Sequence, residues 1–167
     1  MKFSSFVLAT FITGTLMLSG CGKSAAEKNA ESELNDKIMK AHETQMTMAA
    51  RVDELLAKID TLVAKHDSLA KAFPKEMANI STAELTSAKD KLSAAKDGMD
   101  SWMSSHEPYN ASVKHEIAMQ QLTGDLNVVT QVGDQMNTAI AAATSALNAN
   151  AQTMNEVLAK SPKGKKK

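Results

Sequence analysis

The strongest constraint on the fold is a three-four spacing of mostly apolar residues that repeats along almost the whole chain after residue 33. This spacing averages 3.5 residues, which places the side chains on one side of an α-helix and is typical of helices with left-handed supercoiled packing. Three stretches have this spacing. The first contains Leu34, Ile38, Ala41, Gln45, Met48, Val52, Leu55, Ile59, Leu62, His66, Leu69 and Phe73. The second contains Leu85, Ala88, Leu92, Ala95, Met99, Trp102 and His106. The third contains His115, Met119, Leu122, Leu126, Val129, Gly133, Met136, Ile140, Ala143, Leu147, Asn150, Met154 and Val157.

Turn signals separate the three stretches. Pro74 disfavours helix at the residue before it, and Ser81 with Glu84 matches a capping box at the start of the second stretch. Pro108 marks the next turn. The chain has only 7 Gly and 3 Pro and is rich in good helix formers. The sequence therefore predicts an all-α fold, an antiparallel three-helix bundle with coiled-coil-like heptad packing. The helices are expected at about 32–72, 82–106 and 111–159.

The first 21 residues predict export and lipid attachment. Lys2 precedes an uncharged, largely apolar run from Phe3 to Leu18. This run suits a secretory signal and falls short of the roughly 20 residues that span a bilayer. Small residues then lead to Cys21, the only cysteine. The tetrapeptide LSGC at 18–21 resembles the lipobox of bacterial lipoproteins, in which the thiol receives a diacylglyceryl group before cleavage and the new amine is then acylated.

The lipobox resemblance implies the domain organisation and the location. Residues 1–20 would be a lipoprotein signal peptide, 21–31 a flexible tether, 32–160 the helical bundle and 161–167 a basic disordered tail. Two or three acyl chains would hold the protein firmly on a membrane of the cell envelope. Gly22 stands where many inner-membrane lipoproteins have aspartate, so we expect the outer membrane, with the chain exported from the cytoplasm.

Three blocks of the mature chain resemble a group of small helical lipoproteins of Bacteroidetes-type bacteria that are labelled "viral A-type inclusion protein". The blocks are IMKAHETQM at 38–46, MDSWM at 99–103 and VGDQMNTAI at 132–140. One departure is His106, where the pattern of that group has phenylalanine. The resemblance implies a helical fold and an envelope location, and it implies no catalytic residue.

One group of side chains predicts a metal site. Met99, Trp102, Met103 and His106 fall on one face of the second predicted helix, and antiparallel pairing would bring Met46 near them. Thioether sulfur and imidazole are ligands that suit Cu(I), and a tryptophan face adds cation–π stabilisation. We therefore interpret Met46, Met99, Met103 and His106 as candidate copper ligands, with a His/Met-ligated b-type haem as the alternative. Core packing is the simpler interpretation of the same methionines.

Charge is distributed unevenly along the chain. The formal net charge is zero, but residues 21–159 contain 13 basic and 19 acidic side chains. A basic C-terminal tail on an acidic body could contact anionic cell-wall polymer or lipid headgroups; a solubilising disordered end is the other interpretation. Binding to nucleic acid is not expected. The tail residues in question are Lys163, Lys165, Lys166 and Lys167.

The sequence contains no zinc-protease, phosphate-loop or nucleophile-elbow motif, and we do not expect an enzyme. The leading prediction is a lipid-anchored, non-enzymatic scaffold or interaction module, whose partner is an envelope protein or a second copy. In this scaffold, the polar residues Gln45 and Asn150 within the three-four spacing would fix the register of the helices against one another. One alternative is a periplasmic Cu(I)-binding bundle, and another is a tether from membrane to cell wall. No cofactor is predicted besides the covalent lipid, with copper in the first alternative.

Overall fold

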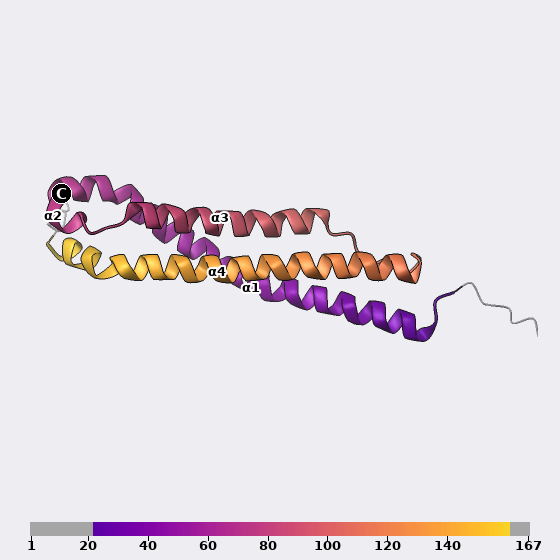
Figure 1. The fold of residues 1–167 in the computed structure, drawn as a ribbon. Coiled ribbons are helices and arrows are strands. Elements are labelled where there is room, and N and C mark those ends of the chain that lie inside the picture. Colours follow the sequence, from indigo (N-terminus) through magenta and orange to yellow (C-terminus); the bar gives the residue numbers. More distant parts are fainter. Residues whose placement is uncertain (1–21, 161–167) are drawn as a thin grey trace, which may run out of the picture.

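The computed structural model describes residues 22–160, which contain four helices and, within that range, no strand. They are α1 (Ala25–Ala72), α2 (Pro74–Met77), α3 (Thr82–Ser105) and α4 (His115–Lys160). Figure 1 shows the three long helices side by side in an extended rod, with short α2 at the end where the chain turns from α1 into α3. The predicted all-α class is confirmed, and α2 is an additional helix that the sequence did not predict.

The start of α1 corrects the predicted tether. Ser24 is the N-cap, and its hydroxyl accepts a hydrogen bond from the backbone N–H of Glu27 at 3.2 Å. The Glu27 carboxylate in turn accepts from the backbone N–H of Ser24 at 2.7 Å, which completes a capping box. Residues 25–31 are therefore helical rather than flexible, and the prediction that the helix begins near 32 was wrong. The predicted start of the last helix, at 111, also differs from the observed start at His115.

The start of α3 also depends on a residue from α4. The Ser81 hydroxyl accepts from the backbone N–H of Glu84 at 3.3 Å, which is one of the two bonds of the predicted capping box. The backbone N–H of Ser81, however, donates to Oδ1 of Asn150 at 3.3 Å. Asn150 is 2% exposed and also donates to the carbonyl of Ala146 at 2.7 Å. This buried amide therefore links α4 to the turn before α3.

Ion pairs define how α1 and α3 are aligned. Asp53 pairs with Lys96, and Asp60 pairs with Lys89, each at 2.6 Å. A step of seven residues forward along α1 is thus matched by seven residues back along α3, so these helices run in opposite directions (Figure 1).

Long-range contacts define the alignment of α4 with the first part of the chain. Three side-chain contacts each join residues 84 positions apart, which means that α4 runs in the same direction as α1. The pairs are Glu31 with His115, Gln45 with Val129, and Glu76 of α2 with Lys160.

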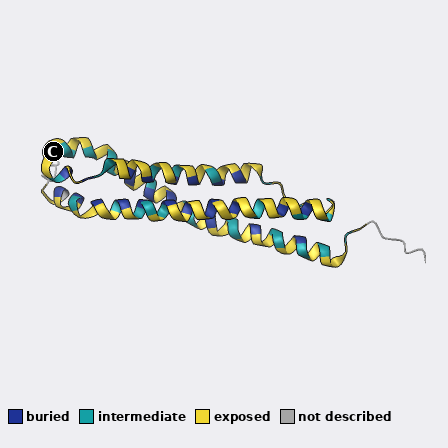
Figure 2. Ribbon diagram, in the orientation of Figure 1, coloured by how far each residue is buried: buried dark blue, intermediate teal, exposed yellow. Residues whose placement is uncertain are grey.

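The core runs along the inner faces of the rod (Figure 2). Every position of the three-four spacing described above is buried or half-buried. The side chains of Leu55, Ile59, Leu85 and Leu92 are at most 1% exposed and make the half of the rod near α2 strongly apolar. Toward the opposite end the core contains polar residues.

That opposite end has only two long helices. Figure 1 shows α1 and α4 extending beyond the end of α3. The turn that follows α3 contributes Tyr109, which packs half-buried against the core. None of the helices in residues 22–160 is long and apolar enough to cross a membrane.

Candidate functional site

The four predicted copper ligands lie in different environments. Met99 belongs to the core and is 3% exposed, whereas Met46 and Met103 are 46% and 40% exposed. His106 ends α3 as its C-cap, and its Nδ1 lies 2.9 Å from Oδ2 of Asp125 on α4. Met99 and His106 therefore already have structural roles, and of these four residues only Met46 and Met103 are exposed.

The ion pairs between α1 and α3 relate these two methionines by heptad register only. The ion pairs of Asp53 and Asp60 with α3 are one heptad apart on each helix. One heptad further, Met46 takes the position of Asp53 on α1, and Met103 takes the position of Lys96 on α3. The residues that line the hollow at Met46 all come from α1, and Met103 is not one of them.

An aromatic stack links the end of α3 to α1. The Trp102 ring stacks on the His106 ring with centroids 4.7 Å apart, and the His42 ring lies 5.2 Å from Trp102 at a tilt of 38°. His42 Nε2 and Trp102 Nε1 are buried and have no hydrogen-bond partner among the described residues. A buried polar nitrogen without a partner is costly, so His42 has an unused ligand atom that the sequence interpretation missed. Its spacing of four from Met46 was the signal that could have revealed it.

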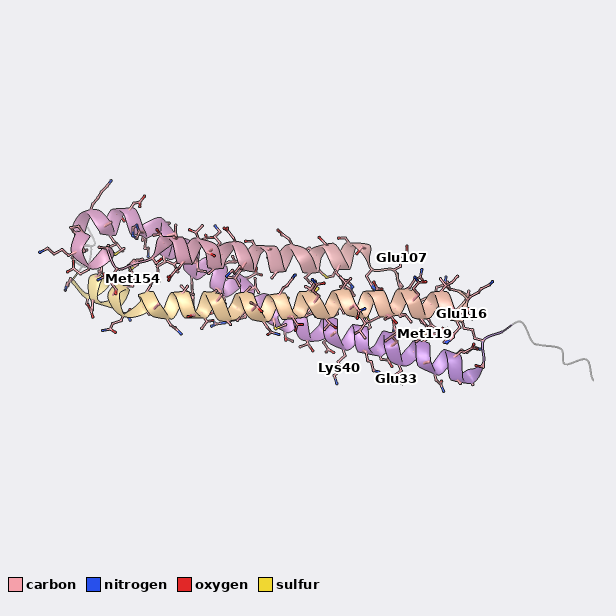
Figure 3. The ribbon with its side chains drawn as sticks, in the orientation of Figure 1. Glu33, Lys40, Glu107, Glu116, Met119 and Met154 are labelled. Carbon is pink, nitrogen blue, oxygen red and sulfur yellow. The ribbon has the colours of Figure 1, made fainter. Side chains whose placement is uncertain are left out.

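A hollow of about 640 Å³ on α1 adjoins His42. Its lining includes His42, Met39 and Met46, and also Lys40, which Figure 3 labels on this part of α1. No group of three or more His, Cys, Asp or Glu side chains in residues 22–160 is arranged to hold a metal ion. A ligand set at this hollow would therefore need methionine sulfur.

A second polar cluster surrounds Glu31 near the start of α1. The Glu31 carboxylate is fully buried and accepts hydrogen bonds from Lys23 at 2.6 Å, from His115 Nδ1 at 2.8 Å and from the Tyr109 hydroxyl. Burial raises the pKa of this carboxyl, but the hydrogen bonds from Lys23, Tyr109 and His115 outweigh it and lower the pKa to about 2. The same contact raises the pKa of Tyr109, because the carboxylate favours the protonated phenol.

This Glu31 cluster holds the residues at the very start of the described chain. The Lys23 side chain is only 10% exposed, and its ammonium group also lies 5.8 Å from the centre of the Tyr109 ring. Position 23 is thus fixed to the end of the rod by buried contacts. The sequence signal was weak, because two of the three partners of Glu31 lie 78 and 84 residues away in the chain.

An apolar groove of about 590 Å³ runs between α1 and α4 in the half of the rod near α2. Figure 3 labels Met154, which lies at this end of the molecule. The floor consists of Leu55, Leu62, Leu147 and Met154, with Ala151 beside them. One edge, from α1, carries Arg51, Lys58 and Lys65; the other, from α4, carries Thr144, Asn148 and Asn155. The groove is open because the side chains along the α4 edge are too short to cover the floor.

Several predicted functional residues lie outside the described range. These are the lipidation site Cys21, the signal peptide 1–20 and the tail lysines Lys163, Lys165, Lys166 and Lys167. Comparison of the chain with protein families, with curated proteins and with solved structures finds no match. The lipobox and the resemblance to the small lipoprotein group therefore stay predictions from the residues themselves.

Proposed function

We propose that this protein is a lipid-anchored envelope lipoprotein whose helical rod is a non-enzymatic scaffold, and that a partner protein binds along the α1–α4 groove. The observation that carries the proposal is the groove itself, a hollow between α1 and α4 whose lining includes the apolar side chains of Leu62, Leu147 and Ala151. An apolar groove between two long helices can bind an amphipathic helix, because the apolar face of that helix packs into the groove.

The charges along the groove favour an acidic occupant. One edge of the groove carries Arg51, Lys58 and Lys65, which are seven residues apart. On a helix bound in the groove, the side chains that face this edge would also recur every seven residues. Glu54 pairs with Arg51 and Lys58, so the edge retains a net positive charge. The described chain is otherwise acidic, with more Asp and Glu than Lys and Arg. An amphipathic helix with carboxylates at heptad spacing would therefore complement this edge.

We also propose that the three long helices pack as an antiparallel bundle with coiled-coil geometry. Two features support this. The α1–α3 ion pairs advance by seven residues on both helices, and the offset of 84 between α1 and α4 partners is a multiple of seven. In this arrangement the buried amides of Gln45 and Asn150 specify the register, because other alignments would leave them without partners.

The Glu31 cluster is consistent with a short connection between anchor and rod. Lys23 is nine-tenths buried and stands two residues after Cys21. If Cys21 carries acyl chains, only Gly22 separates the lipid from the buried contacts of the rod. We propose that the end of the rod with the Glu31 cluster lies at the membrane surface. The α1–α4 groove, which lies in the other half of the rod, would then be presented away from the bilayer.

Site-specific photo-crosslinking in intact envelopes tests the scaffold proposal. A photo-reactive residue replaces Ala151, which lines the groove, or Ala141, an exposed control on the same helix that lines no part of it. We expect a crosslinked protein from position 151 and none from position 141, and we expect the captured peptide to be an acidic amphipathic helix.

Charge reversal supplies the control for specificity. Lys58→Glu with Lys65→Glu should abolish the crosslink from position 151, whereas Lys75→Glu with Lys91→Glu makes the same charge change outside the groove and should preserve it. Equal capture at both positions, capture unaffected by the groove reversal, or capture of a second copy of this chain would contradict the proposal.

A further inference from the structure

Glu54 lies among the cations of the α1–α4 groove and already binds two of them. It lines the groove together with Arg51, Lys58 and Lys65. Its Oε2 accepts a hydrogen bond from Nη1 of Arg51 at 2.6 Å, and its Oε1 accepts one from the ammonium group of Lys58 at 2.5 Å. Each carboxylate oxygen of Glu54 is thus paired with a different cation of the groove edge.

This arrangement follows from the helix and is open to a partner. Glu54 is three residues after Arg51 and four before Lys58, the spacings at which side chains on a helix are neighbours. Hydrogen bonds from Lys58 and Arg51 hold the pKa of Glu54 below its usual value, so the carboxyl is charged at neutral pH. The three side chains are between 42% and 54% exposed. A bound helix can therefore reach the same cations that Glu54 contacts.

Lys65 has a different environment. The residues three and four positions away from it on α1 are Thr61, Leu62, Ser68 and Leu69, none of which is charged. None of the groove residues from α4 is charged either. Within the part of the chain that the structure describes, Lys65 is therefore the groove cation without a carboxylate beside it.

We propose that Glu54 is an internal competitor for the acidic helix that the groove binds, an inference that rests on the proposed function. In the free protein Glu54 occupies Arg51 and Lys58, whereas Lys65 is open to a carboxylate of the partner. A partner carboxylate that binds Arg51 or Lys58 has to replace an existing contact and lies close to the like charge of Glu54. Glu54 therefore lowers the affinity for acidic helices and favours those with enough carboxylates to overcome it.

Partner capture by the photo-reactive residue at position 151 tests this role, in isolated envelopes at low and at high salt. Glu54→Gln preserves the size of the side chain and removes its charge. We expect this change to raise the yield of crosslinked partner about twofold to fivefold at low salt, the range that interactions between exposed charges support. The gain should shrink at high salt, because salt screens exposed charges. Lys65→Gln should lower the yield by a similar factor.

An ion pair outside the groove supplies the matched controls. Glu33 is also an exposed glutamate of α1, and it pairs with Lys37 at 2.9 Å. Figure 3 labels Glu33 at the opposite end of the rod from Met154, which lines the groove. Glu33→Gln and Lys37→Gln make the same changes of charge as Glu54→Gln and Lys65→Gln, and they should leave the yield unchanged. Circular dichroism should show that every variant is equally helical.

The direction of the change decides between competition and positioning. If Glu54 instead positioned Arg51 and Lys58 for the partner, Glu54→Gln would lower the yield, so a lower or unchanged yield would overturn the inference. An equal rise in Glu33→Gln would also overturn it, because net charge alone would then explain the effect. Absence of capture from position 151 in every variant would refute the proposed function itself.

Discussion

Gly133→Ala tests the alignment of α1 and α4 most sharply among single substitutions. Gly133 is buried in α4, and a Cβ atom added there would lie 2.6 Å from Nε2 of Gln45 and 3.3 Å from its Cδ. That amide nitrogen donates to the carbonyl of Val129. The new methyl group therefore has to displace the Gln45 side chain from its hydrogen bond, because the first distance is shorter than any normal contact.

The expected magnitude is a balance of opposing effects. Alanine in place of glycine within a helix stabilises by about 1 kcal/mol. Against this, the displaced buried amide loses its hydrogen bond at a cost of about 1–3 kcal/mol, and overpacking costs about 1–3 kcal/mol. These contributions together give a net loss of about 1–5 kcal/mol. Gly124→Ala is the matched control, since its Cβ would meet nothing within 4 Å on the same helix, and it should gain about 1 kcal/mol.

Urea unfolding followed by circular dichroism measures both free energies of unfolding. In a Gln45→Ala background the side-chain amide that the new methyl group would meet is absent, so Gly133→Ala should increase the free energy of unfolding. The double-mutant cycle should then give a coupling energy above about 1 kcal/mol. If Gly133→Ala in the natural background stabilised the protein as much as Gly124→Ala does, Gln45 would not face Gly133, and the register of α1 against α4 would be wrong.

Three further predictions concern the rest of the fold. The pKa of Glu31 is lowered from 4.5 to about 2, so its stabilising contribution is complete above pH 4.5 and is lost as the pH falls toward 2. Glu31→Gln should flatten the pH dependence of the urea midpoint in that window, and an unchanged slope would argue against the buried cluster. Leu92→Ala removes a fully buried core side chain and should cost about 2–5 kcal/mol in the same unfolding assay; a cost below 1 kcal/mol would place Leu92 outside the core. Lys89→Ala breaks a pair with Asp60 in which both side chains are about half exposed, so stability should change by less than about 1 kcal/mol, and a larger change would mean that this pair is not a surface contact.

The core was predictable because burial in a helix follows a local period. The three-four spacing depends only on nearby residues, and every position that it selected is buried or half-buried in the structure. The start of α1 could also have been predicted, because Ser24 and Glu27 have the spacing of a capping box. The sequence interpretation treated this segment as a polar spacer because of its composition, and so it missed a local signal that was present.

The sites were harder to predict because they depend on contacts between distant parts of the chain. Antiparallel pairing predicted that Met46 lies near Met103, and this stays a prediction. It could not show that His106 bonds Asp125 while His42 keeps a free nitrogen, because both depend on how the rings pack around Trp102. The groove between α1 and α4 was equally hidden, since it arises only when the short α4 side chains are set beside the apolar floor.

The central claim is that this rod is held on a membrane of the envelope by lipid on Cys21. The most direct measurement is the intact mass, with fragmentation of the N-terminus, of the protein purified from its native envelope. We expect a chain that begins at Cys21 and carries two or three acyl chains. A chain that retains residues 1–20 and has an unmodified thiol at Cys21 would contradict the account.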